Sequence, residues 1–244
     1  MADMTGQVAL VTGGVRGIGL AISERLAARG VTVAAGYSRG KDVADAFCEA
    51  HPGASAHQGN IGSAEDCERV IQEVLDTHGR LDILVNNAGI TLDKTVRKMT
   101  VEDWDRVVQV NLSGAFYLSR AILQHMLDRG YGRIVNISSI IGEAGNIGQA
   151  NYAAAKAGLF GLTMSLAQET ARKGITVNSV APGYVSTEMV RAVPEEALAK
   201  VVAKIPVGRL GEPEEIARVV EFLVDPDSAF ITGQIYSVNG GQHM

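Results

Sequence analysis

Residues 8–19 read VALVTGGVRGIG, an apolar run that passes directly into a turn with glycine at positions 13, 14, 17 and 19. The run at 8–11 is apolar on both faces of an extended chain, which is typical of a strand buried inside a parallel sheet. A helical pattern over 18–29 follows the turn. The stretch therefore predicts strand, tight glycine turn and helix, the beginning of a βαβ unit.

The same alternation continues to the end of the chain, without a linker or a low-complexity segment. It predicts one α/β domain spanning residues 1–244, a Rossmann-like doubly wound parallel sheet of seven strands flanked by helices. The expected strands are 8–12, 31–36, 55–58, 81–86, 133–138, 176–181 and 234–238. The expected helices are 18–29, 42–50, 64–78, 101–109, 112–129, 151–173 and 213–224.

Composition excludes several classes of protein. The 244 residues carry a net charge of −5, which disfavours nucleic acid as a partner, and no apolar run is long enough to span a membrane. The two cysteines form no disulfide framework and the five histidines show no ligand spacing, so we expect no metal. The start MADMTGQVAL lacks the pattern of a secretory signal, which favours a cytoplasmic protein.

The glycine turn has the chemistry of a pyrophosphate site, because small residues admit phosphates to the backbone and the helix N-terminus offers free N–H groups. The turn alone leaves S-adenosylmethionine open as a ligand. The end of the second expected strand favours NADP(H) among dinucleotides, since no acidic residue occurs there before Asp42. Ser38 and Arg39, with Arg16 in the turn, could bind a 2′-phosphate.

Further polar residues follow later strands. Residues 86–89 read NNAG after the fourth expected strand, and Ser139 follows the fifth. Tyr152 and Lys156 lie one helical turn apart, on one face of a helix. A neighbouring ammonium group favours the tyrosinate, so we expect Lys156 to lower the pKa of Tyr152 toward neutrality.

In the order and spacing of these elements, the chain resembles the short-chain dehydrogenase/reductase family over essentially its whole length. The resemblance implies that Ser139 holds a substrate carbonyl, that Tyr152 donates a proton, and that Lys156 binds the nicotinamide ribose and tunes Tyr152. It also implies that Asn111 holds a water that relays protons to Lys156. The matching elements are Thr12, Gly13, Gly17 and Gly19 of the turn, residues 86–89, Asn111, Ser139, Tyr152, Lys156, Pro182, Gly183 and Thr187.

The resemblance also implies a set of NADP(H)-binding residues. Asn60 replaces an aspartate that many relatives use near adenine, and its amide can still form hydrogen bonds. The set comprises Gly13, Val15, Arg16, Gly17, Ile18, Gly19, Ser38, Arg39, Asn60, Ile61, Asn87, Ala88, Gly89, Tyr152, Lys156, Pro182, Gly183, Val185 and Thr187.

Within the family, the chain is most similar to reductases of 3-oxoacyl thioesters. Details such as PGY at 182–184 favour the branch that reduces acetoacetyl-CoA over the branch that reduces 3-oxoacyl groups on acyl carrier protein. Dehydrogenases of sugars, polyols or ring alcohols, and a non-catalytic NADP-binding sensor or assembly subunit, are more distant alternatives. The substrate residues that the likeness implies are Asp93, Lys98, Ser139, Asn146, Ile147, Gln149 and Tyr184.

Two features extend beyond the site. The segments 112–129 and 151–173 are apolar nearly all round, more than a helix on a sheet needs, so we expect them to form the interface of a homotetramer. The segment at about 187–210 has a loose apolar pattern and lies after Pro182 and Gly183. We expect it to form a small lid over the substrate, with a static helical pair as the alternative.

Overall fold

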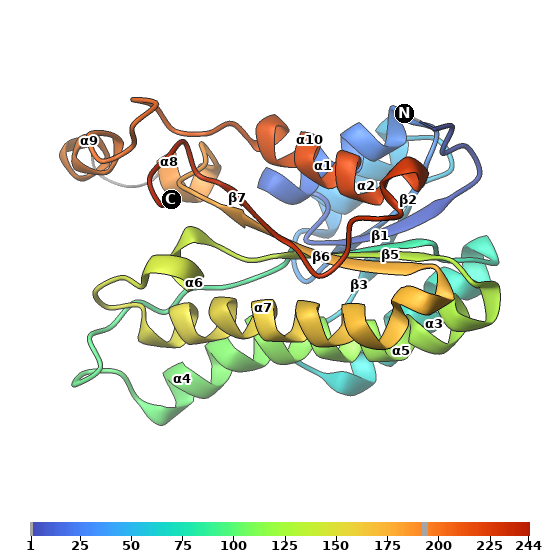
Figure 1. The fold of residues 1–244 in the computed structure, drawn as a ribbon, viewed down its shortest axis with the longest axis horizontal. Coiled ribbons are helices and arrows are strands. Elements are labelled where there is room, and N and C mark those ends of the chain that lie inside the picture. The colour runs from blue at the N-terminus through green and yellow to red at the C-terminus, as the bar shows by residue number, and fades with distance from the viewer. Residues whose placement is uncertain (1, 192–194) are drawn as a thin grey trace.

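A computed structural model describes residues 2–191 and 195–244, which form one seven-stranded parallel sheet in the order β3-β2-β1-β4-β5-β6-β7 (Figure 1). The predicted fold class is thereby confirmed. Because the chain winds outward from β1 in one direction and then from β4 in the other, the polypeptide reverses between these two strands. The strands are β1 (Val8–Thr12), β2 (Thr32–Tyr37), β3 (Ser55–Gln58), β4 (Ile83–Asn86), β5 (Gly132–Ile137), β6 (Ile175–Pro182) and β7 (Ile235–Val238).

Helices cover both faces of the sheet, each burying an apolar side (Figure 1). The first layer contains α1 (Gly17–Ala27), α2 (Lys41–Ala50) and α10 (Pro213–Val224). The second contains α3 (Ala64–His78), α5 (Gly114–Arg129) and α7 (Ala150–Thr170). The central strands are buried along their whole length, which explains why their sequences are continuous apolar runs rather than alternating ones.

The expected gap between helices 101–109 and 112–129 is not a break. A π-helical turn, Gln109–Ser113, joins α4 (Val101–Val108) directly to α5. This turn contains Asn111, which is buried. Because a π-turn inserts a residue into the helical ladder, it changes the direction of side chains locally and often marks a functional site.

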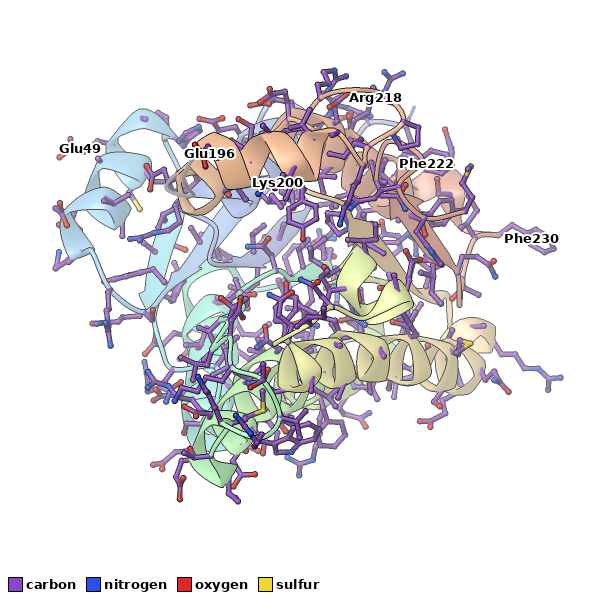
Figure 2. The ribbon with its side chains drawn as sticks, turned by 90° about the vertical axis from the view of Figure 1, so that its left-hand side faces the viewer. Glu49, Glu196, Lys200, Arg218, Phe222 and Phe230 are labelled. Carbon is purple, nitrogen blue, oxygen red and sulfur yellow. The ribbon has the colours of Figure 1, made fainter. Side chains whose placement is uncertain are left out.

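The expected lid contains two short helices, α8 (Glu188–Arg191) and α9 (Glu195–Val202). Residues 192–194 in its middle, including Val193 of the apolar pattern, lie outside the described residues. The following loop returns to the sheet, where Val185 and Gly211 form an isolated parallel bridge. Figure 2 shows Glu196 and Lys200 on α9, and both side chains are exposed.

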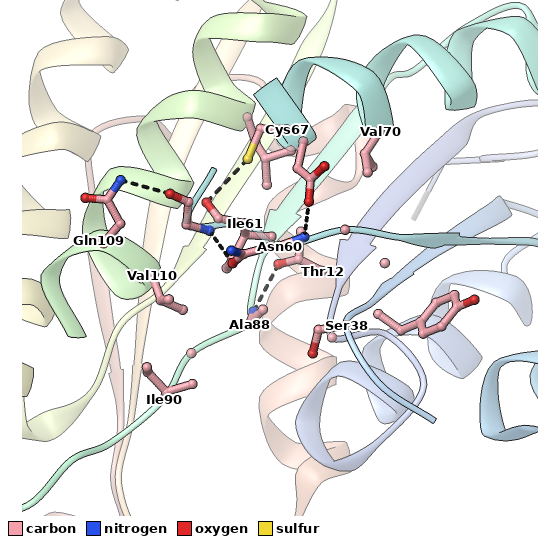
Figure 3. Close-up of a pocket in the computed structure, with 18 of the residues that line it drawn as sticks. Thr12, Ser38, Asn60, Ile61, Cys67, Val70, Ala88, Ile90, Gln109 and Val110 are labelled. Atoms are coloured by element: carbon pink, nitrogen blue, oxygen red, sulfur yellow. Dashed lines mark hydrogen bonds between the residues drawn. The ribbon is translucent and has the colours of Figure 1, made fainter. Parts of the chain in front are cut away.

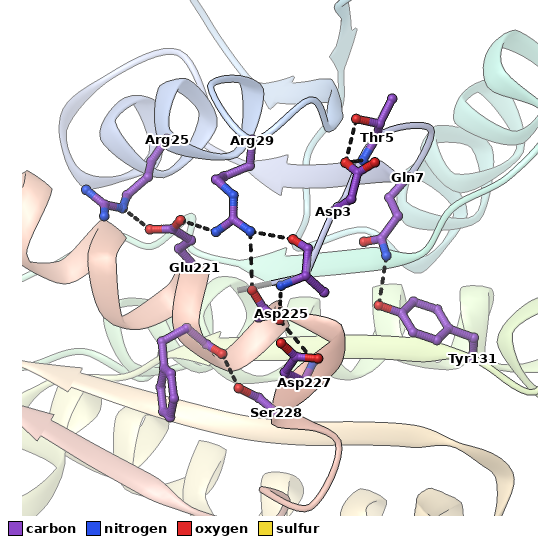
Figure 4. A network of polar contacts seen from close by, with 12 residues as sticks. Asp3, Thr5, Gln7, Arg25, Arg29, Tyr131, Glu221, Asp225, Asp227 and Ser228 are labelled. Atoms are coloured by element: carbon purple, nitrogen blue, oxygen red, sulfur yellow. Dashed lines mark hydrogen bonds and ion pairs between the residues drawn. The ribbon is translucent and has the colours of Figure 1, made fainter.

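A buried ion-pair network ties the N-terminus to the last helix (Figure 4). Arg29, two residues after the end of α1, donates to Glu221 and, at 3.3 Å, to Asp225 near the end of α10. Both carboxylates are buried, with 3% and 2% exposure. Burial on its own raises the pKa of Asp225, but hydrogen bonds from Asp227, Ala2 and Arg29 outweigh it, so the pKa is lowered. These contacts fix α1, whose first turn faces the glycine-rich loop, against α10.

Two phenylalanine side chains are exposed at one edge of the sheet. Phe222 on α10 and Phe230 are exposed beside β7, the strand at the edge of the sheet (Figure 2). Across residues 2–191 and 195–244, none of the helices combines the length and the apolar character that a bilayer crossing would require.

Candidate active site

A cavity of about 650 Å³ opens at the carboxyl ends of β1, β2 and β4 (Figure 3). This edge of an open parallel sheet is where such folds bind ligands. Seven of the predicted cofactor residues line it: Gly13, Ser38, Arg39, Asn60, Ile61, Ala88 and Gly89.

The glycine turn has a geometry that side chains would not permit. Gly13 and Gly17 have φ values of 64° and 52°, in the left-handed region that glycine favours. A Cβ atom on Gly19 would lie 2.1 Å from the carbonyl oxygen of Gly13. Val15 is buried in the apolar core, so its predicted contact with a cofactor could involve only its backbone. The backbone thus stays open toward the N-terminus of α1, as binding of a pyrophosphate requires.

The two arginines proposed for the 2′-phosphate are close in space. Arg16, the N-cap residue of α1, donates a 3.3 Å hydrogen bond from Nη2 to the carbonyl oxygen of Arg39. Both residues and Ser38 are exposed at the end of β2. No carboxylate hydrogen-bonds either arginine among the contacts that the described residues show, so both guanidinium groups can face an anion.

The NNAG segment is fastened to β1 through one threonine. The Thr12 hydroxyl oxygen accepts hydrogen bonds from the N–H groups of Asn87 and Ala88, each at 2.9 Å, and the Asn87 amide donates to the Thr12 carbonyl oxygen. A Cβ on Gly89 would lie 2.4 Å from the Asn111 carboxamide oxygen. The segment therefore passes between the glycine turn and Asn111 with no room for a larger residue.

The Asn111 carboxamide forms three hydrogen bonds within the protein. It donates to the carbonyl oxygens of Ile90 and Val107, at 2.9 and 2.8 Å, and accepts from the Ile90 N–H. The side chain itself joins the π-turn to the segment after β4.

Ser139 and Tyr152 meet at the ends of two helices. Ser139 is the N-cap residue of α6 (Ile140–Ala144), a short helix that the sequence pattern does not predict, and its hydroxyl accepts from the Ile141 N–H at 3.1 Å. Tyr152 lies in the first turn of α7. Burial raises the pKa of the Tyr152 phenol, a hydrogen bond with Ser139 opposes this rise, and the charge of Asp93 adds to it.

Lys156 is buried, with 3% exposure, and its ammonium group lies 5.6 Å from the centre of the Tyr152 ring. It donates to the Ile137 carbonyl oxygen at 2.8 Å. Burial lowers the pKa of Lys156 to about 8. The expectation that Lys156 lowers the pKa of Tyr152 is wrong for this structure: burial raises the pKa of Tyr152 and disfavours the charged forms of both groups.

The predicted substrate residues lie in different parts of the structure. Three of them form a chain: Asn146 donates to the Gln149 oxygen at 2.8 Å, and the Gln149 amide donates to Asp93 at 3.0 Å. These contacts join the segment after β4 to the segment before Tyr152. Ile147, at 91% exposure, and Lys98 point to solvent instead, and Tyr184 lies in a separate, smaller pocket of about 120 Å³ beside β7.

Other predicted residues lie around the large cavity rather than in its lining. The Thr187 methyl group lies 3.6 Å from where a Gly17 Cβ would be, so the start of the lid faces the glycine turn. Val185 is buried, and the Thr187 N–H donates to its carbonyl oxygen. Ile18 is the second residue of α1, Pro182 is the last residue of β6, and Gly183 follows it.

Sequence reasoning missed several residues that line the cavity. Arg106, Gln109 and Val110 come from α4 and the π-turn, and their only sequence signal is their position just before Asn111. His57 and Cys67 come from β3 and α3. Burial raises the pKa of Cys67 to about 12, which makes this thiol unreactive.

These residues fit a dinucleotide. The open glycine turn matches a pyrophosphate, the paired arginines match a 2′-phosphate, and the cavity between them has room for an adenosine. In the described parts of the chain, no cluster of three or more histidine, cysteine or carboxylate side chains could hold a metal ion.

Comparison with known proteins agrees with this arrangement. Residues 5–243 match the family model described as Enoyl-(Acyl carrier protein) reductase. The chain belongs to the short-chain dehydrogenase/reductase family. Members of this family bind a nicotinamide cofactor, and this one is an oxidoreductase that acts on a secondary alcohol or a ketone.

Individual relatives of this short-chain dehydrogenase/reductase cover nearly its full length. It is 53% identical to an acetoacetyl-CoA reductase of Shinella zoogloeoides, with 97% of this chain and 98% of the relative covered. It is 54% identical to an acetoacetyl-CoA reductase of Rhizobium meliloti, with the same coverage. It is 45% identical to a 3-oxoacyl-[acyl-carrier-protein] reductase of Vibrio cholerae, with 99% of both chains covered.

Proposed function

We propose that this protein reduces the 3-oxo group of acetoacetyl-CoA to (R)-3-hydroxybutyryl-CoA with NADPH. The observation that carries the proposal is the proximity of Ser139, Tyr152 and Lys156, next to Gly89 in the lining of the cavity. The relatives at 53% and 54% identity are named acetoacetyl-CoA reductases, which supports the thioester of coenzyme A as substrate.

The residues divide the chemistry between them. NADPH, when bound, supplies the hydride to the 3-oxo carbon. Ser139 holds the oxo oxygen by a hydrogen bond, and Tyr152 donates its phenolic proton to that oxygen as negative charge develops there. The raised pKa of Tyr152 keeps this proton in place before reaction. The positive charge of Lys156 then favours the phenolate that remains.

Reduction of 3-oxoacyl groups on acyl carrier protein is a second candidate, because a reductase with that name is 45% identical over 99% of the chain. Asp93, Asn146 and Gln149 form the polar rim that would meet the thioester arm in either case. The exposed Lys98 could bind the phosphate of either carrier. A non-catalytic NADP-binding subunit is disfavoured, since such a protein has no need of the buried Lys156 beside Tyr152.

The deciding experiment measures kcat/KM for acetoacetyl-CoA and for acetoacetyl-acyl carrier protein, each with NADPH and with NADH. We expect the highest value for acetoacetyl-CoA with NADPH. A higher value for the carrier-protein thioester would establish the second candidate. No reduction of either thioester would contradict both.

Replacement of Arg39 tests the proposed preference of the protein for NADPH over NADH. Replacing Arg39 by alanine removes one guanidinium from the proposed phosphate site. A hydrogen bond to a charged group contributes roughly 1.5–3 kcal/mol when buried and less at the surface. We therefore expect the KM for NADPH to rise about 10-fold. NADH, which lacks the 2′-phosphate, is the internal control. An equal loss with both cofactors would contradict the role of Arg39.

Three broader features are also proposals. We infer a homotetramer that uses the outer faces of α5 and α7, where Phe116 and Met164 are 44% and 43% exposed.

We also infer that α8 and α9 form a lid whose order increases when NADPH binds. Equal mobility of this segment with and without NADPH would contradict the lid. A cytoplasmic location stays a prediction from the sequence.

A further inference from the structure

Polar contacts join the helix that carries Tyr152 and Lys156 to the strand that leads to Ser139. The Ser138 hydroxyl donates a 2.8 Å hydrogen bond to the main-chain carbonyl oxygen of Lys156. Two turns further along α7, the Thr163 hydroxyl oxygen accepts a 2.9 Å hydrogen bond from the Asn136 amide on β5. All three of Ser138, Asn136 and Thr163 are buried, with 3%, 0% and 0% exposure.

These bonds belong to a buried polar ladder across the centre of the sheet. The Asn136 oxygen accepts from the Asn86 amide at 2.8 Å, so β4, β5 and α7 are linked in series. Asn86 immediately precedes Asn87, which binds Thr12 at the glycine turn. The ladder therefore connects the strand end beside the cofactor cavity with the helix that carries the reacting groups.

The hydrogen bonds of this ladder add directional contacts to the apolar packing of α7. The helix packs closely on β6, α6 and α4, and its inner contacts include small groups such as Ala155 and Gly142 of α6. The buried side of α7 also carries Leu159 and Leu166, at 1% and 8% exposure. Apolar contact has no directional preference, whereas a hydrogen bond requires one distance and one angle.

We propose that Ser138, Asn136 and Thr163 are positioning residues that fix α7 along β5, and so hold Tyr152 and Lys156 at the correct place relative to Ser139. The inference rests on the proposed function, because it assigns importance to that distance. A displacement of about 1 Å between reacting groups can reduce a rate about 100-fold. Loss of one bond from the ladder should therefore reduce turnover before it reduces cofactor binding.

A matched pair of threonines on α7 provides the test. Thr170 is buried like Thr163, but its hydroxyl donates only to Leu166 of its own helix, at 2.7 Å. We expect Thr163→Val to lower kcat about 10-fold with the KM for NADPH unchanged, and Thr163→Ser to restore kcat. Thr170→Val should leave kcat within about 2-fold of wild type. Ser138→Ala, closest to Lys156, should have the largest effect on kcat, about 10- to 100-fold.

Two readouts separate this inference from the proposed function. Hydrogen–deuterium exchange of residues 150–158 needs no substrate, and we expect faster exchange in Thr163→Val than in Thr170→Val. Equal kcat or equal exchange in the two valine variants, with comparable loss of Tm, would show a purely structural role and overturn the proposal. Inactivity of the wild-type enzyme toward both thioesters would contradict the proposed function. The exchange comparison would still test whether Thr163 fixes the position of α7.

Discussion

At the scale of single residues, the site depends on charges that are held where water cannot stabilise them. Lys156 is buried and Tyr152 is half-buried, and burial shifts the pKa of each group in the direction that favours its neutral form. The hydrogen bond between Ser139 and Tyr152 acts in the opposite direction on the phenol. A proton donor in this setting keeps its proton until the substrate oxygen becomes basic.

Tyr152→Phe removes that proton and little else, since only the hydroxyl group is lost. We expect kcat to fall about 1,000-fold, within the range that general acid catalysis contributes, and NADPH to bind with nearly unchanged Kd. Steady-state turnover and fluorescence titration with NADPH measure the two quantities. Turnover above about one tenth of the wild-type value would contradict the assignment of Tyr152 as the proton donor.

The ionisation of Lys156 should be visible in the pH profile. Its pKa of about 8 means that the ammonium form exists below this pH and is lost as the pH rises through it. We expect kcat/KM for NADPH, which reports groups of the free enzyme, to decline above about pH 8. Lys156→Arg should abolish this decline because a guanidinium stays charged. A decline that persists in Lys156→Arg would assign it to another group.

At the scale of elements, close contacts between backbones decide where the cofactor turn can lie. A Gly19→Ala methyl group would meet the Gly13 carbonyl oxygen at 2.1 Å and the Asn87 amide at 2.6 Å. We expect weaker NADPH binding by at least about 10-fold, and a loss of about 1–3 kcal/mol in the free energy of unfolding, as for other overpacked sites. Gly161→Ala on α7 is the control, because a Cβ there meets no atom within 4 Å. Similar NADPH affinities in the two variants would refute this account of the turn.

The elements also show what a sequence can and cannot reveal. Strands such as β1 and β3 have the predicted bounds, because each run is apolar or flanked by turn residues. The π-turn at Gln109–Ser113 was not predicted, since its hydrogen-bond spacing leaves no periodic signal. The five-residue α6 is too short to show a period. The link between Asp93 and Gln149 joins residues 56 positions apart, and only tertiary packing creates it.

At the scale of the whole molecule, one face of the helical layer that contains α5 and α7 gathers small and exposed apolar residues. The outer side of α7 exposes Ala154, Ala157, Gly161 and Met164, and α5 beside it exposes Phe116. Small residues let a second helix approach closely, and exposed apolar side chains such as Phe116 and Met164 gain stability when another subunit covers them. The same two helices lead to Asn111 and carry Tyr152, so assembly would stiffen the elements that hold the reacting groups.

Met164→Glu places a charge in the middle of this face, and we expect it to convert the proposed tetramer into smaller species, because a buried unpaired carboxylate is costly. Light scattering after size exclusion measures the mass. Val43→Glu is the matched control: Val43 is 38% exposed on α2, in the opposite helical layer, and its replacement should leave the mass unchanged. If assembly stiffens α7, kcat of Met164→Glu should fall together with the mass. A wild-type monomer, or an assembly that survives Met164→Glu, would contradict the proposed interface.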